Sequence, residues 1–179
     1  CSYNTENGEE NRYFLNTLNV GLSAHVVELA NKRKPILFAS LIYHLTGLFY
    51  MLFHRQNFHM RFKLNNQLID QKLMTLCIGN SVSYGLTPSA VPYNGFLDVS
   101  AIRMPKLFGI LEGLLMLAHR KILNYELVTP FRTTEIFFES LGGAPLSIDG
   151  RSFKPAMPMS VTVWPESLNL IIPSRVVKR

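Results

Sequence analysis

Two carboxylates, Asp98 and Asp149, stand in the loop-rich and turn-forming parts of the sequence, where chemistry is most often found. Asp149 is followed by Gly150 and Arg151. A carboxylate on a tight turn can accept a proton, and a planar, permanently charged guanidinium suits a phosphate on a nucleotide or a lipid head group. The same residues also fit a plain hairpin, because Asp-Gly is a common turn and a hairpin arginine is often only solvated. Both interpretations stay open from these residues alone.

Other classes of catalytic motif are missing. The sequence has no Gly-x-x-x-x-Gly-Lys-Ser/Thr phosphate loop, no Gly-x-Gly-x-x-Gly and no Gly-x-Ser-x-Gly elbow. His54 and His59 are the closest pair among the histidines, and their spacing of five is poor for a metal. Cys1 and Cys77 form neither a disulfide framework nor a zinc pattern, which favours a reducing, cytoplasmic setting. Cys77 lies in an apolar run and is predicted to be a small buried hydrophobe.

Composition indicates one folded domain with a basic surface. Hydrophobic residues make up 47% of the 179 residues and charged residues 17%, a balance that excludes disorder. The net charge of +6 favours anionic partners, such as phosphorylated ligands or an acidic membrane surface. No basic run is interleaved with aromatic residues, so nucleic acid is not expected as a partner.

The elements that must position these residues are mostly short strands. Helical patterns are predicted at 23–30, 35–53 and 105–121. Segments typical of strands stand at 12–22, 58–64, 72–78, 96–104, 125–128, 133–139, 146–148, 159–163 and 168–172. Many short strands with two or three helices predict a mainly β domain, an antiparallel sandwich or barrel. The Gly-, Pro- and Asn-rich segment 79–95 is too irregular for an element and is predicted to be a functional loop.

Residues 36–53 contain no Asp, Glu, Lys or Arg and are long enough to raise the question of a membrane span. Polar positions such as Ser40, His44 and Thr46 interrupt the stretch. We therefore expect a core helix, or one that touches a bilayer surface, rather than a transmembrane helix.

Three segments, in order along the chain, resemble one family. Residues 14–27 are similar to the pattern F-x-N-x-x-x-x-G-x-x-A-x-V, and residues 78–99 to N-x-x-x-x-G-G-G-x-x-x-x-P-x-A-x-x-x-D-G-x-L-D-V with a shorter glycine run. Residues 146–151, followed by a last hairpin ending at Pro173, are similar to I-D-G-E and a closing V-x-P. The set resembles the C-terminal domain of the diacylglycerol kinase and sphingosine kinase family, including its bacterial lipid kinase branch.

The resemblance implies half of a two-domain enzyme that transfers the γ-phosphoryl group of ATP, with Mg²⁺, to a lipid hydroxyl of the diacylglycerol or sphingoid type. A nucleotide-binding N-terminal domain would bind most of the ATP, and the β-rich domain would hold the lipid. On this division, residues 1–11 are a polar lead-in from the nucleotide-binding domain and residues 12–179 are the lipid kinase C-terminal domain. The chain alone is then expected to be inactive.

The resemblance also implies site residues. Arg151 stands where the family has its proton-accepting glutamate, and an arginine cannot be a general base, so Asp149 is the candidate base in its place. Arg151, Tyr84 and Gly85 are candidates for substrate binding.

A structural Mg²⁺ is implied in the loop, held by the backbone carbonyls of Val91 and Phe96 and by the side chain of Asn94, where the family has an aspartate. A neutral carbonyl should bind Mg²⁺ less well than a carboxylate, and without an ion Asn94-Gly95 is simply a good turn.

The implied partners are a lipid substrate and a membrane surface, which the protein would contact peripherally from the cytoplasm. A homodimer is left open. The alternative hypothesis is a non-catalytic, lipid-binding member of the same family, because both positions that carry chemistry depart from the family pattern.

Overall fold

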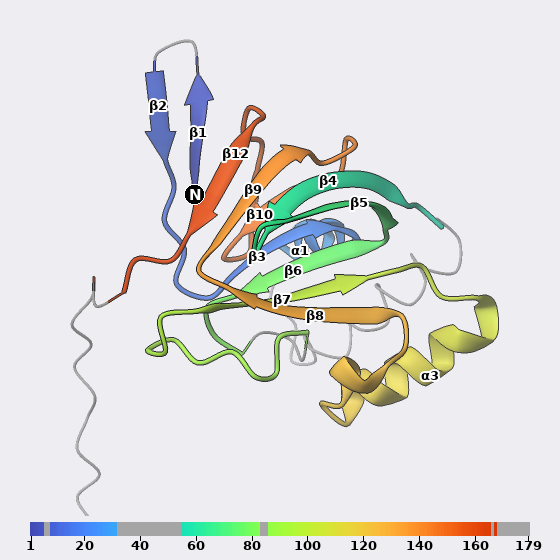
Figure 1. Cartoon of the computed structure of the whole chain (residues 1–179). Helices are drawn as coiled ribbons and strands as arrows, with labels where there is room; N and C mark the ends of the chain where they lie inside the picture. Colours follow the sequence, from blue (N-terminus) through green and yellow to red (C-terminus); the bar gives the residue numbers. More distant parts are fainter. Residues whose placement is uncertain (6–7, 32–54, 83–85, 166, 168–179) are drawn as a thin grey trace, which may run out of the picture.

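Two six-stranded antiparallel sheets pack face to face in the computed structural model, which describes residues 1–5, 8–31, 55–82, 86–165 and 167 (Figure 1). The first sheet has the strand order β2-β1-β12-β9-β4-β5. Its strands are β1 (Ser2–Thr5), β2 (Gly8–Asn11), β12 (Met159–Thr162), β9 (Glu135–Ser140), β4 (Phe58–Leu64) and β5 (Gln67–Leu73). The second sheet has the order β11-β10-β3-β6-β7-β8. Its strands are β11 (Arg151–Phe153), β10 (Leu146–Ile148), β3 (Thr17–Gly21), β6 (Thr75–Gly79), β7 (Leu97–Ile102) and β8 (Val128–Thr133).

The hydrophobic core lies between the sheets and is built from alternate positions of the strands. On β4, Met60, Phe62 and Leu64 are buried, whereas the residues between them are exposed. Leu18 and Val20 of β3 join them in the same cluster from the second sheet. The period of two in the sequence therefore marks the face of each strand that points inward.

The strand β3 leads directly into the helix α1 (Leu22–Asn31) at Gly21, which has a φ of +82°. Its N–H donates to the carbonyl of Pro145 at 2.8 Å. The helix covers part of the outer face of the second sheet, and the hydroxyls of Ser23 and Thr75 lie 2.6 Å apart there. A positive φ favours glycine, so this residue permits the sharp change from strand to helix.

The outer face of the second sheet is lined with small polar residues that are buried. Cys77 lies among them and is 1% exposed, as predicted, and burial raises the pKa of its thiol to about 11. The hydroxyl of Ser147 is the one buried side-chain oxygen or nitrogen without a hydrogen-bond partner among the residues that the structure describes. Cys77, buried and with a raised thiol pKa, is therefore a packing residue rather than a nucleophile.

The helix α3 (Leu107–Ala118) follows β7 and is joined to β8 by the 3-10 helix η1 (Ile122–Asn124). Figure 1 shows it at one end of the sandwich, beyond the strands. None of the helices described is long and apolar enough to cross a membrane.

The predicted fold class is confirmed: the domain is mainly β, antiparallel and sandwich-like, with two α-helices among the described residues. The prediction of one strand over 72–78 is wrong. Met74 separates β5 from β6, and these strands belong to different sheets. The apolar run by itself predicts one strand, but the chain crosses from the first sheet to the second inside it. Residues 35–53 and 168–172 lie outside the described residues.

Two further differences have physical causes. Residues 1–11 contain β1 and β2, and β1 pairs with β12 at the edge of the first sheet. Since β2 is exposed along its whole length, no apolar alternation announced it. The strand predicted at 125–128 is wrong for its first residues, because Tyr125 directly follows η1 and its side chain packs against α3.

Candidate functional site

The three segments that resemble the lipid kinase family come together at one end of the second sheet. Thr17 pairs with Gly79, Gly79 with Asp98, and Asp98 with Arg132. The adjacent residue Leu18 pairs with the last residue of β10, just before the Asp-Gly turn. We call this region the motif end and define it by Leu15–Thr17, Gly79–Ser81, Asp98, Arg132 and Ile148–Arg151.

Asp149 binds the segment that leads into β3. One carboxylate oxygen accepts a hydrogen bond from the N–H of Leu15 at 2.7 Å. The other accepts from the N–H groups of Asn16 and Thr17, both at 2.9 Å. Its own N–H donates to the carbonyl of Thr17 at 2.9 Å, and its φ is +44°. The candidate base is thus the acceptor for three successive backbone amides, which is the geometry of a structural cap.

Asn16 joins the first motif segment to the second. Its backbone carbonyl accepts from the N–H groups of Asn80 and Ser81 at 2.9 and 3.2 Å. The Ser81 hydroxyl donates to the side-chain oxygen of Asn16 at 3.0 Å, and the Asn80 amide donates to the Leu15 carbonyl at 3.0 Å. The start of the loop after β6 is therefore fixed to the segment that Asp149 caps.

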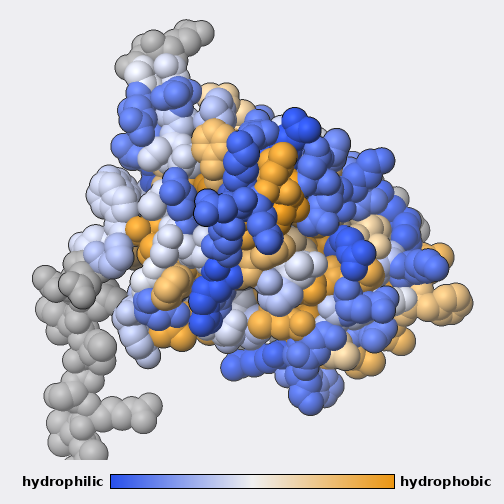
Figure 2. Space-filling model, viewed as in Figure 1, coloured by the Kyte–Doolittle hydropathy of each residue, from blue (hydrophilic) through white to orange (hydrophobic). Residues whose placement is uncertain are grey.

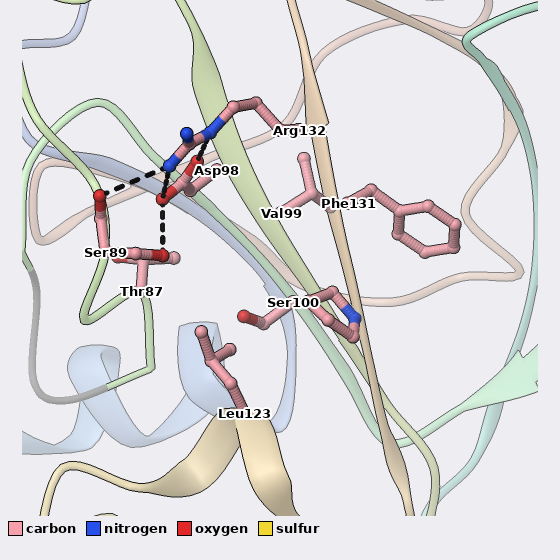
Figure 3. A pocket seen from close by; sticks show the side chains of 9 residues that line it. Thr87, Ser89, Asp98, Val99, Ser100, Leu123, Phe131 and Arg132 are labelled. Atoms are coloured by element: carbon pink, nitrogen blue, oxygen red, sulfur yellow. Dashed lines mark hydrogen bonds and ion pairs between the residues drawn. The ribbon is translucent and has the colours of Figure 1, made fainter.

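Asp98 and Arg132 form a two-point ion pair across neighbouring strands (Figure 3). The Nε of Arg132 donates to Asp98 Oδ1 at 2.7 Å and one terminal nitrogen donates to Oδ2 at 3.2 Å. The Ser89 hydroxyl donates to the same Oδ2 at 2.7 Å. Burial pushes the pKa of Asp98 up, but the hydrogen bonds from Arg132 and Ser89 and the charge of Arg132 outweigh it, so the pKa is lowered. Asp98 is thus ionised at neutral pH, and its charge is already matched by Arg132.

A pocket of about 300 Å³ lies beside this ion pair. Figure 3 shows Arg132, Asp98 and Ser89 together on one side of it and Leu123 on another. Its hydroxyls are already used as donors: Thr87 donates to the carbonyl of Ser81 and Ser100 to that of Leu86. The full lining is Thr87, Ser89, Asp98, Val99, Ser100, Leu123, Pro130, Phe131 and Arg132. The polar groups of this lining are thus paired within the chain, and Val99, Leu123, Pro130 and Phe131 supply apolar walls.

Gly79 sits where β6 enters the loop, with Thr87 packed directly against it. A Cβ on this glycine would lie 2.3 Å from the Thr87 hydroxyl and 2.7 Å from its Cβ. The loop therefore closes over the strand so tightly that only a residue without a side chain fits.

The donors predicted for Mg²⁺ do not fit that ion. The side-chain oxygen of Asn94 accepts a hydrogen bond from the N–H of Phe96 at 2.9 Å, and the Val91 carbonyl accepts from the N–H of Asn94 at 3.2 Å. Gly95 has a φ of +73°. The donor set is neutral, and two of its three oxygens already take part in the turn, whereas Mg²⁺ prefers anionic oxygens in octahedral arrangement. Among the described residues no cluster of three His, Cys, Asp or Glu side chains could hold a metal.

The remaining candidates are Arg151, Tyr84 and Gly85. Arg151 is exposed at the start of β11, next to the capped turn, and its side chain makes no hydrogen bond or ion pair with the rest of the described chain. Tyr84 and Gly85 lie outside the described residues. Arg151 thus keeps all of its side-chain donors for a ligand.

Sequence reasoning named Asp98 only as one of two acids and missed Arg132 and Ser89. One signal was available: Asp98 is the second residue of a strand whose other residues are uncharged, and a buried charge requires a partner. Its partner could not be chosen among the basic residues without the pairing of β7 with β8. At the motif end, the carboxylates of Asp98 and Asp149 are therefore hydrogen-bonded within the chain. The guanidinium of Arg151 makes no such bond with the described residues.

Comparison with known proteins identifies the class of domain. The family model described as the YegS C-terminal NAD kinase beta sandwich-like domain matches residues 16–172. The chain belongs to this family, and the predicted membership of the C-terminal domains of the lipid kinase family is confirmed at this level. None of the curated proteins compared matches the chain.

Solved structures share the fold. Two structures of Bacillus anthracis str. Sterne proteins, each provisionally assigned as a diacylglycerol kinase, have TM-scores of 0.60 and 0.58, with 16% and 14% identity. A third structure, of a diacylglycerol kinase of the same organism, has a TM-score of 0.57 and 16% identity. Each alignment covers 92% of this chain and 53% of the other. The chain spans about half the length of these proteins.

Proposed function

We propose that this chain is the substrate-side domain of an ATP-dependent lipid kinase that phosphorylates a hydroxyl of a diacylglycerol- or sphingoid-type lipid. The observation that carries the proposal is the meeting of three lipid kinase-like segments at the motif end, in a domain of that family. Such a convergence is expected where a domain completes a cleft, because residues far apart in sequence must act together there.

ATP would bind mainly to a separate nucleotide-binding domain, since this sequence has no phosphate loop. Arg151 is the group that this domain offers to phosphate, because its fork is exposed and uncommitted. Asp149 stays the candidate acceptor of the lipid hydroxyl proton in this proposal, and its oxygens also accept hydrogen bonds from the backbone amides of Leu15, Asn16 and Thr17.

The direct test is transfer of the ATP γ-phosphoryl group by the intact gene product to diacylglycerol and to sphingoid bases. We expect phosphorylated lipid with one of these classes. The chain of 179 residues alone should give none. If the intact product phosphorylates no lipid, the assignment as an enzyme fails.

Arg151 allows a sharper test on the same protein. Arg151→Ala should abolish binding of phosphorylated lipid, whereas Arg151→Lys should lose it only in part, because a lysine keeps the charge but not the planar fork. The matched control is Lys154→Ala, which removes an exposed positive charge after β11. Unchanged binding in both Arg151 variants would end the proposed phosphate role.

A non-catalytic lipid-binding protein is the second candidate, and the capped state of Asp149 favours it. A protein of this kind would bind lipid with an affinity that does not depend on ATP. Cytoplasmic location and contact with a membrane surface are shared by both candidates, and neither requires a homodimer.

A further inference from the structure

The helix α3 presents its large apolar side chains to solvent. Leu107, Phe108, Leu111 and Leu115 are 60%, 96%, 65% and 53% exposed. Positions one, four and eight residues after the first lie on one side of a helix. In Figure 2, hydrophobic surface reaches the edge of the molecule at the place where Figure 1 draws α3. We call these four residues the outer stripe.

The opposite side of α3 packs against the rest of the domain through two glycines. The hydroxyl of Tyr125 donates to the carbonyl of Gly109 at 2.8 Å. A Cβ on Gly109 would lie 2.7 Å from that hydroxyl, and one on Gly113 would lie 3.2 Å from the Tyr125 ring. Ile110 is the buried residue of the helix. The helix thus turns glycines inward and leucines and a phenylalanine outward, which is the reverse of a helix that serves only the core of its own domain.

Basic residues stand at both ends of the outer stripe. Lys106 precedes the helix, and His119, Arg120 and Lys121 follow it, all of them exposed. Glu112 is the single charged residue within the helix. An apolar stripe between basic ends is complementary to a bilayer with anionic head groups.

A second copy of this chain fits the stripe less well. A symmetric contact would bring the same basic ends together in a protein of net charge +6, and like charges across an interface repel. Twelve helical residues extend about 18 Å, short of the roughly 30 Å of a bilayer core, so the helix can lie in the interface but not span it.

We propose that the outer stripe of α3 docks on the surface of an anionic lipid bilayer, with Phe108 and Leu111 inserted below the head groups and the basic ends among the phosphates. The choice of a membrane as partner rests on the proposed lipid kinase function. The docking itself requires neither ATP nor phosphoryl transfer. The stripe lies beyond the Ile102–Val128 end of the second sheet, opposite the motif end at Asp98 and Arg132.

The test is flotation of the chain with vesicles of phosphatidylcholine and phosphatidylserine in about a two-to-one ratio, without ATP. The double variant Phe108→Ser, Leu111→Ser should weaken binding by at least about tenfold, because two large apolar side chains no longer leave water. Lys106→Gln with Lys121→Gln should weaken it by roughly fivefold per charge, and only on vesicles that contain phosphatidylserine.

Matched controls exist on the same chain. Leu68→Ser removes an exposed leucine of β5, and Lys154→Gln removes an exposed lysine beyond β11. Both should bind vesicles like the unaltered chain. Binding that does not change in the double serine variant would overturn the proposal, as would a dimer in sedimentation that this variant dissociates. Because vesicle binding is measured without transfer, an inactive protein that still docks would refute only the kinase assignment.

Discussion

The motif end of the second sheet and the outer stripe of α3 differ in how their side chains are paired: those of the first are hydrogen-bonded within the chain, and those of the second are exposed to solvent. At the motif end, Asp149 accepts from three amides and Asp98 from Arg132 and Ser89. On α3, four large apolar side chains are more than half exposed. A region whose groups are committed to one another holds a shape, whereas a region with uncovered apolar surface needs a partner. The carboxylates of the motif end are thus bonded within the chain, and the surface without a motif is the stronger indication of an interaction.

The glycine of the first motif should be the most sensitive of these positions. In Gly21→Ala, the new Cβ would lie 2.5 Å from the backbone carbonyl of Met74, and the φ of +82° would be strained. We expect a loss of about 3 kcal/mol or more in the free energy of unfolding, measured with urea. Gly143→Ala is the control, since its φ is +75° but no atom lies within 4 Å of the new Cβ. It should lose only about 1 kcal/mol. Equal losses would show that the clash has no effect.

Asp149 comes next. Asp149→Ala removes all three acceptor bonds to Leu15–Thr17 and should cost about 2 kcal/mol of stability. Asp149→Asn should cost about half as much, roughly 1 kcal/mol, because one oxygen still accepts and Asn tolerates a positive φ. If Asn instead leaves stability unchanged and abolishes turnover in the intact gene product, Asp149 is the base and not a cap.

The sequence predicts the motif end only in part. Its residue types and the turn at Asp149-Gly150 are visible in the sequence. The function of Asp149 depends on amides more than a hundred residues earlier, which only the pairing of β10 with β3 brings close. The alternation on β4 predicted that strand with the bounds observed. The sequence predicts a strand at Tyr125. It cannot show otherwise, because the contact of this side chain with two glycines of α3 is tertiary and leaves no local pattern.

The ion pair at Asp98 predicts a dependence of stability on pH. Its pKa is lower in the folded chain than the usual aspartate value of about 3.9, so its contribution is complete above that value and is lost as the pH falls through the folded pKa. Asp98→Asn should cost about 1–2 kcal/mol at pH 7, a modest figure because the Arg132 side chain is half exposed. The two proteins should converge in urea unfolding below the usual aspartate range. A constant difference at every pH would mean that Asp98 contributes through shape rather than charge.

The smallest effect on stability is expected on the outer stripe, and it separates the two regions most clearly. Phe108 is 96% exposed, so Phe108→Ser removes almost no buried surface and replaces one moderate helix former by another. Its free energy of unfolding should change by less than about 0.5 kcal/mol. Ile110→Ala, two residues further on the same helix, should lose about 3 kcal/mol because Ile110 is 3% exposed. If Phe108 contributed to folding, Phe108→Ser would lose more free energy of unfolding than Ile110→Ala. An exposed aromatic side chain still favours transfer to apolar surroundings. If Phe108→Ser leaves the free energy of unfolding unchanged but loses vesicle binding, Phe108 serves membrane binding rather than folding.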